Sequence, residues 1–196
     1  MPRRSDSKEK MVDAARRLFK QNGYAGTAFA HILEASEAPR GSVYFHFPGG
    51  KEQLGQEVVL ADVAGSTLEI NRDALESTTP GELISKYLFR TRDLLVKRRF
   101  QYGCAFAPLV IEQSAVSDAL RGTARTAFTD IITTLAARLS DLGVPAGDAH
   151  ELARATMAAF EGCLIVARAQ HDTSCFDTMA ALLAEKANAA AAVAAL

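Results

Sequence analysis

Residues 27–47 read TAFAHILEASEAPRGSVYFHF and have the proportions of two short helices joined by a tight turn. Threonine is a favoured N-cap, so we expect the first helix to open at Thr27 and to end near Ser36. The apolar side of this helix then carries Phe29, Ile32 and Leu33. The pattern predicts a helix-turn-helix, a motif whose second helix enters the major groove of DNA.

The second helix is expected to begin at Pro39, because proline is favoured at the first helical position. Val43 and Phe47 lie four residues apart, so both can face inward together. The outward side is polar or small and carries Arg40, Gly41, Ser42, Tyr44 and His46. One face of the helix is therefore suited to packing and the other to a duplex.

Several residues of this segment suit particular groups of DNA. Arg40 can donate two hydrogen bonds to a guanine. Gly41 costs about 1 kcal/mol of helix stability but permits close approach of the backbone. Tyr44 and His46 suit phosphate oxygens. Lys51 opens the next helix, whose unpaired N–H groups also favour a phosphate. Double-stranded DNA is the partner that the segment predicts.

Helical periodicity continues through the rest of the chain, and no segment alternates as a strand does. A preceding helix carries Phe19 and ends at Gly23, a residue type that is common just after a helix. Residues 104–112 contain Pro108, so any helix there is short or kinked. Further helices are expected at 51–71, 79–98, 117–142, 147–170 and 175–196. We expect an all-α fold of about nine helices.

The composition excludes several classes of protein. Of 196 residues, 48% are hydrophobic and 23% charged, which is enough for a folded core. Residues 1–54 carry nine Lys/Arg against six Asp/Glu, whereas the remainder carries thirteen against seventeen. This division fits contact with phosphate at one end only. No apolar run approaches the roughly 18 residues of a membrane helix, and we expect no secretory signal. We expect a cytoplasmic protein with no membrane partner.

The three cysteines, Cys104, Cys163 and Cys175, are odd in number and widely spaced. This spacing argues against a disulfide framework or a zinc site and favours buried, small hydrophobic residues. We expect no metal and no cofactor. Two other hypotheses stay open: a thiol sensor or small helical enzyme that uses these cysteines, and a nonspecific DNA-binding protein, which the net charge of −1 disfavours.

The run RGSVYFHFPGGKEQL at residues 40–54, preceded by the Phe19…Gly23-Tyr24 ending, resembles the TetR family of repressors. Its FPGGKEQL version is similar to the LmrA/YxaF-like branch. GCAFAP at residues 103–108 and FEGCLIVARAQ at residues 160–170 are similar to the C-terminal domain of that branch.

The resemblance implies an all-helical homodimer that is not an enzyme. A three-helix DNA-binding domain (residues 1–50) would be joined to a bundle of about six helices (residues 51–196) for effector binding and dimerisation. The implied function is repression at a palindromic operator, with release by a small lipophilic or aromatic effector.

The resemblance also assigns roles to residues. Those implied to hold phosphates are Thr27, Tyr44, His46 and Lys51. Those implied to face the bases are Arg40, Gly41, Ser42 and Phe45. The sequence departs from the family pattern at His31, Glu37 and Pro39. Glu37 replaces a turn glycine, so a positive φ there would cost about 1 kcal/mol.

The C-terminal helices offer candidates for the other two functions. Large, soft or polar-tipped side chains can line an effector cavity or belong to the core, and these candidates are Tyr87, Tyr102, Cys104, Phe106, Phe128, Phe160 and Cys163. A stripe of small residues, continued on the last helix, can form a dimer interface or pack within one subunit. The residues of this predicted interface are Ala155, Ala158, Ala159, Gly162, Val166, Met179 and Leu183.

Overall fold

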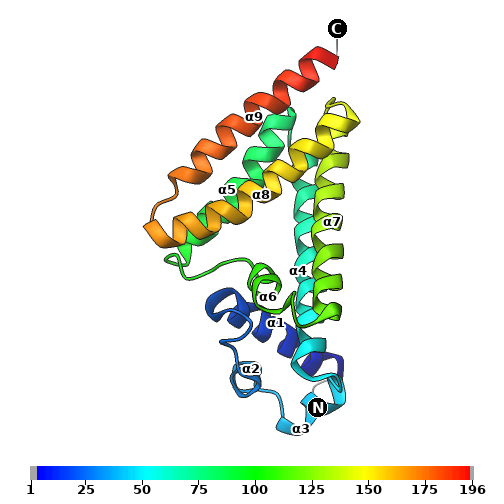
Figure 1. Ribbon diagram of the computed structural model, residues 1–196, viewed down its shortest axis with the longest axis vertical. Coiled ribbons are helices and arrows are strands. Elements are labelled where there is room, and N and C mark those ends of the chain that lie inside the picture. Colours follow the sequence, from blue (N-terminus) through cyan, green and yellow to red (C-terminus); the bar gives the residue numbers. More distant parts are fainter. Residues whose placement is uncertain (1–3, 195–196) are drawn as a thin grey trace. The chain divides into compact units, whose positions relative to one another are not determined.

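The computed structural model of the protein describes residues 4–194, without the side chains of residues 4–6 and 40. Within this range no strand occurs. The helices are α1 (Arg4–Asn22), α2 (Phe29–Ser36), α3 (Arg40–His46), α4 (Gly50–Leu75), α5 (Pro80–Lys97), α6 (Ala107–Gln113), α7 (Asp118–Asp141), α8 (Ala146–Gln170) and α9 (Ser174–Ala194). The predicted all-α fold is confirmed (Figure 1).

Local sequence signals account for several helix ends. The hydroxyl of Thr79 caps α5 by accepting the backbone N–H of Glu82 at 3.2 Å. Gly23 follows α1 with a φ of 76°, as expected for the residue after a helix. α4 is longer than predicted and runs to Leu75 rather than Asn71.

Two predicted helix starts are wrong by one residue. The N-cap of α2 is Ala28 rather than Thr27, because the Thr27 hydroxyl turns back and donates to the carbonyl oxygen of Gly23 at 2.8 Å. Pro39 is the N-cap of α3 rather than its first residue. Neither N-cap makes a side-chain hydrogen bond to the first turn of its helix.

The chain divides into two compact units. The first unit extends to residue 64 and also includes residues 104–127. The second unit holds residues 65–103 and the chain from residue 128 onward. The sequence predicts a division at residue 50 by function, with DNA binding before it and effector binding and dimerisation after it. That functional division stays a prediction.

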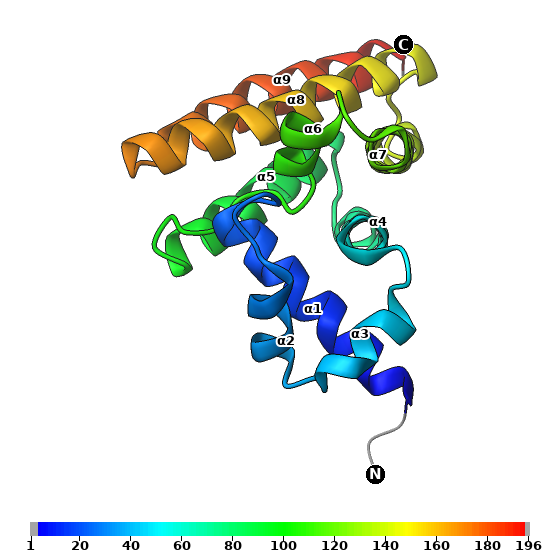
Figure 2. The ribbon, with the colours of Figure 1, turned by 60° about the horizontal axis from the view of Figure 1, so that its bottom comes forward.

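The first unit has a core to which helices far apart in the sequence contribute. Its fully buried side chains include Met11, Phe19, Ile32, Phe47, Leu54 and Leu109. In Figure 2, α1, α2 and α3 lie together at the N-terminal end of the chain. α2 packs on α1, and the turn that follows α2 leads into the exposed α3.

In the second unit, α9 packs along both α5 and α8 (Figures 1 and 2). α5 and α9 approach closely at Gly81, whose N–H donates to Oδ1 of Asn188 at 2.9 Å. A Cβ at Gly81 would lie 2.7 Å from Nδ2 of Asn188 and 2.8 Å from the carbonyl oxygen of Ala184. Only glycine allows this spacing without a shift of one helix.

No helix in the described part of the chain is long and apolar enough to cross a membrane. Among the same residues, no group of three or more His, Cys, Asp or Glu side chains could hold a metal ion. The cytoplasmic location and the lack of a cofactor stay predictions.

Candidate nucleic-acid interface

α3 buries one face and presents the other to solvent. Val43 is 4% exposed and Phe47 is fully buried, so the predicted inward pair is confirmed. Tyr44 and Phe45 are 81% and 64% exposed. Most of the surface of these two aromatic side chains is therefore open to a binding partner.

The turn between α2 and α3 is held in a conformation that residues other than glycine rarely adopt. Glu37, the C-cap of α2, has φ 54° and ψ 24°, and its N–H donates to the carbonyl oxygen of Glu34 at 3.2 Å. The left-handed conformation costs a residue with a Cβ about 1 kcal/mol. The positive φ considered at Glu37 from the sequence is therefore present. The resulting strain lies in the turn that leads from α2 into α3.

Three other predicted DNA contacts lie on or beside the exposed face of α3. A Cβ at Gly41 would meet nothing within 4 Å, so the backbone there is open to close approach. The Ser42 hydroxyl donates to the carbonyl oxygen of Pro39 at 2.6 Å, which stabilises the first turn and leaves the oxygen able to accept. His46 is half-buried, and its ring packs edge-on against Phe45 at 5.1 Å.

Two predicted contacts gain no support from the structure. Thr27 is fully buried, because α2 begins one residue later than expected and the hydroxyl bonds to Gly23. We therefore correct the predicted interface by leaving Thr27 out. The side chain of Arg40 lies outside the described residues, and its contact with guanine stays a prediction.

The ammonium group of Lys51 ties the start of α4 to the turn after α1. Nζ donates to the carbonyl oxygen of Tyr24 at 2.5 Å and lies 4.3 Å from the centre of the Tyr24 ring. Burial lowers the pKa of Lys51, and the nearby carboxylate of Glu112 opposes this shift. Because an ammonium group has three donors, the bond to Tyr24 is compatible with the predicted phosphate contact.

Sequence reasoning missed Glu112, which lies on α6 and contacts the turn that leads to α2. Its Oε2 accepts the backbone N–H of Ala25 at 2.5 Å. Burial raises the pKa of the Tyr24 hydroxyl, and the negative charges of Glu52 and Glu112 raise it further. Glu112 and Ala25 are 87 residues apart, so no local pattern in the sequence signals their contact.

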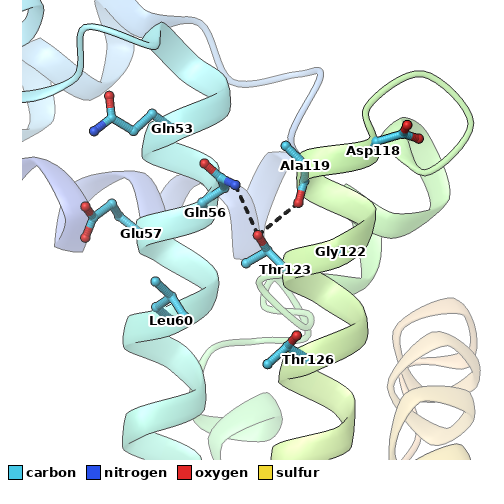
Figure 3. A pocket seen from close by; sticks show the side chains of 9 residues that line it. All are labelled: Gln53, Gln56, Glu57, Leu60, Asp118, Ala119, Gly122, Thr123 and Thr126. Carbon is cyan, nitrogen blue, oxygen red and sulfur yellow. Dashed lines mark hydrogen bonds between the residues drawn. The ribbon is translucent and has the colours of Figure 1, made fainter.

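A groove of about 590 Å³ runs between α4 and α7 within the first unit (Figure 3). Nε2 of Gln56 donates across it to the hydroxyl oxygen of Thr123 at 3.2 Å. That hydroxyl in turn donates to the carbonyl oxygen of Ala119 at 2.9 Å. The predicted effector residues are not among those that line this groove.

The predicted effector residues divide between the two units. Cys104 and Phe106 belong to the first unit, and the second unit holds Tyr87, Tyr102, Phe128, Phe160 and Cys163. The structure brings the rings of Tyr87 and Phe160 together, with centroids 5.4 Å apart. The Tyr87 hydroxyl also lies 3.5 Å from the sulfur of Met157. Contact of these residues with an effector stays a prediction.

Cys163 and Cys175 lie next to each other where α8 and α9 meet. Sγ of Cys175 donates to the carbonyl oxygen of Cys163 at 3.5 Å. Burial, followed by the neighbouring Cys175 thiol, raises the pKa of Cys163 to about 12. Since the thiolate is the reactive form of cysteine, this environment favours a structural role for Cys163 over thiol sensing.

The predicted dimer residues divide between the inside and the outside of the chain. Ala159 and Leu183 are 9% and 7% exposed and pack within their own subunit, so we correct the predicted interface by removing them. Met179 is half-buried. The exposed members are Ala155, Ala158, Gly162 and Val166. Ile165, which the sequence prediction omitted, is 63% exposed and adds to the apolar surface, as does Leu182 of the last helix, which is 58% exposed.

Comparison with known proteins identifies both parts of the chain. Residues 11–58 match the profile of bacterial regulatory proteins of the tetR family. Residues 80–182 match the C-terminal domain of LmrA/YxaF-like transcriptional regulators.

Similar proteins cover most of the chain. The HTH-type transcriptional regulator LmrA of Bacillus subtilis is 33% identical over 82% of this chain and 86% of its own length. An uncharacterised HTH-type transcriptional regulator of Mycobacterium tuberculosis is 33% identical over 87% of this chain and 88% of its own. A solved TetR-family regulator from Agrobacterium tumefaciens shares the fold, with a TM-score of 0.80 at 21% identity over 94% of this chain and 98% of that chain.

A helix-turn-helix with an exposed second helix, in an all-helical chain, defines the class of DNA-binding transcriptional regulators. Within that class, the chain belongs to the TetR family, in its LmrA/YxaF-like branch. The family is one of regulators rather than enzymes.

Proposed function

We propose that the protein is a homodimeric repressor that binds a palindromic operator and is released by a small lipophilic or aromatic effector. The observation that carries this proposal is the exposed aromatic face of α3, which rests on the buried pair Val43 and Phe47. Repression is supported by two similar proteins that are HTH-type transcriptional repressors, DhaR of a Mycobacterium species and AcnR of Corynebacterium glutamicum.

In this proposal, residues 1–50 and the start of α4 bind DNA. Tyr44, His46 and Lys51 contact phosphates and fix the position of the protein on the duplex. Gly41 and Ser42 approach the base edges. Phe45, which is 64% exposed, packs against a thymine methyl group in the major groove. Residues 51–196 bind the effector and form the dimer.

The dimer interface is proposed on the exposed apolar face of α8 and α9. Ala155, Ala158 and Gly162 are small, so a helix of a second subunit can approach closely there. Ile165 and Leu182 would be removed from water by that contact. Two copies of α3 would then meet two operator half-sites about 34 Å apart, which is one turn of DNA.

The effector is proposed to bind in the C-terminal part of the chain, where the neighbouring, mutually tilted rings of Tyr87 and Phe160 suit an aromatic compound. A coupling of about 2–3 kcal/mol between effector and DNA would reduce operator affinity roughly 30- to 150-fold. A thermal-shift screen over lipophilic compounds would identify candidates, and each candidate should then weaken operator binding in the same assay as below.

The proposal is tested by fluorescence anisotropy with DNA from upstream of its own or a neighbouring gene. The control is random DNA of equal length at the same salt concentrations. We expect operator binding to be about 10³-fold tighter or more at physiological salt. Equal affinities for the two DNAs would show that the protein is not a sequence-specific regulator at these sites.

A further inference from the structure

The turn at residues 23–27 lies between α1 and α2. Within this turn the Thr27 N–H donates to the carbonyl oxygen of Tyr24 at 3.2 Å. The Thr27 hydroxyl donates to the carbonyl oxygen of Gly23. These bonds set the direction in which α2 begins, and α2 is the helix that carries the turn to α3.

Two residues from outside the turn also bond to it. Lys51, at the start of α4, donates to the carbonyl oxygen of Tyr24. Glu112, on α6, accepts the N–H of Ala25 at 2.5 Å. A Cβ at Gly23 would lie only 2.8 Å from Oε1 of Glu112, so the carboxylate is seated directly against the backbone of the turn.

Apolar packing brings α6 to the same place. A Cβ at Gly55 of α4 would lie 3.1 Å from the ring of Tyr24, 3.2 Å from Leu109 and 3.3 Å from Leu120. The turn, α6 and the start of α7 therefore meet at one point on α4. The first unit groups α6 with the DNA-reading helices, and the carboxylate of Glu112 lies at this junction.

We propose that Glu112 is a positioning residue for operator binding: its carboxylate holds the turn at residues 23–27, and through it the direction of α2 and α3. The bond is charge-assisted, and such bonds are roughly twice as strong as neutral ones. This inference rests on the proposed function, because it concerns how the DNA-reading helices are held rather than whether they read DNA.

The first test compares specific with nonspecific DNA binding in the full-length protein. Glu112→Ala is expected to lower operator affinity about 10-fold. Binding to random DNA should change less than twofold, because it depends on phosphate charge and not on the aim of α3. Glu112→Gln, which keeps an oxygen acceptor without the charge, should recover most of the operator affinity.

Glu76→Ala is the matched control, because Glu76 is exposed and lies outside the first unit. It should leave both affinities unchanged. Equal operator affinities of Glu112→Ala and Glu76→Ala would overturn the proposal. A parallel loss of operator binding and random-DNA binding in Glu112→Ala would also overturn the proposal. A misfolded protein gives that result, whereas a misdirected α3 weakens only operator binding.

Amide hydrogen exchange at Ala25 tests the contact without relying on DNA. The wild-type amide of Ala25 should exchange more slowly than an unprotected amide in the same sequence. The rate should rise in Glu112→Gln and rise further in Glu112→Ala. An unprotected Ala25 amide in the wild type would refute the inference, whereas absence of operator binding with a protected amide would refute only the proposed function.

Discussion

Glu37 shows how a single residue can carry strain at a functional turn. Its φ of 54° is in the left-handed region, where a Cβ is unfavourable. The turn must nevertheless take this shape, because the chain has only three residues between α2 and α3 in which to change its direction. Protein stability is therefore lowered at the residue that determines where α3 points.

Replacing Glu37 by glycine should remove this strain. We expect Glu37→Gly to raise the free energy of unfolding by about 0.5–1 kcal/mol, measured by denaturant unfolding. Glu34→Gly, inside α2, is the opposite control, because glycine in a helix interior costs about 1 kcal/mol. Destabilisation by both substitutions would contradict the strained turn.

Adjacent residues of α3 should separate DNA binding from stability. Tyr44→Ala removes an 81% exposed side chain, so it should weaken operator binding while the unfolding free energy changes by less than about 0.5 kcal/mol. Val43→Ala opens a small cavity in the core and should cost about 1–3 kcal/mol of stability. Anisotropy and denaturant unfolding on both variants measure the two effects, and a stability loss in Tyr44→Ala would mean that the side chain belongs to the core.

At the residue scale, the sequence predicted side-chain positions that depend on nearby residues in the chain. The four-residue spacing of Val43 and Phe47 was enough to place both inside. Thr27 was misassigned, because its hydroxyl had two possible partners and the structure uses Gly23 rather than the first turn of α2. The contact of Glu112 with Ala25 joins residues 87 apart and could not be read from local patterns.

Among the helices, the close approach of α5 and α9 is the most demanding contact. Gly81→Ala would place a Cβ 2.7 Å from the amide nitrogen of Asn188 and 2.8 Å from the carbonyl oxygen of Ala184. We expect this substitution to cost about 1–3 kcal/mol, because the backbone carbonyl cannot move aside.

Gly65→Ala provides the matched control for that substitution. Gly65 lies inside α4, and a Cβ there would meet nothing within 4 Å. It should stabilise the protein by about 0.5–1 kcal/mol, because alanine is the better helix former. Thermal unfolding of the two variants should shift in opposite directions, and a neutral Gly81→Ala would contradict the close packing of α5 and α9.

The presence of each helix was predictable from hydrophobic periodicity. Helix ends were predictable only where a capping residue or a proline marked them. Thr79 followed by proline marked the start of α5 correctly. Pro39 was placed one residue too far into α3, because proline suits both the first position and the one before it. The α4 prediction stopped at Asn71, although the helix continues to Leu75 with no breaking residue in between.

At the scale of the whole molecule, the proposed dimer makes the clearest prediction. Ile165→Glu places a charge on the exposed face of α8 and should convert the dimer to the mass of one chain in analytical ultracentrifugation, because an unpaired charge would be buried in the interface. Leu75→Glu is the control, since Leu75 is 90% exposed and lies at the end of α4. A dimer unaffected by Ile165→Glu would place the interface elsewhere.

The discontinuity of the first unit limits how the regulator can be re-engineered. A fragment that ends at residue 64 loses Leu109 and Leu120, which pack around Gly55 beside the ring of Tyr24. A chimaera that replaces residues 1–50 by a foreign DNA-binding domain would lose the contacts that Tyr24 makes beside Gly55, Leu109 and Leu120. New DNA specificity is better introduced by changing the outer surface of α3, or by transplanting residues 104–127 together with the DNA-binding domain.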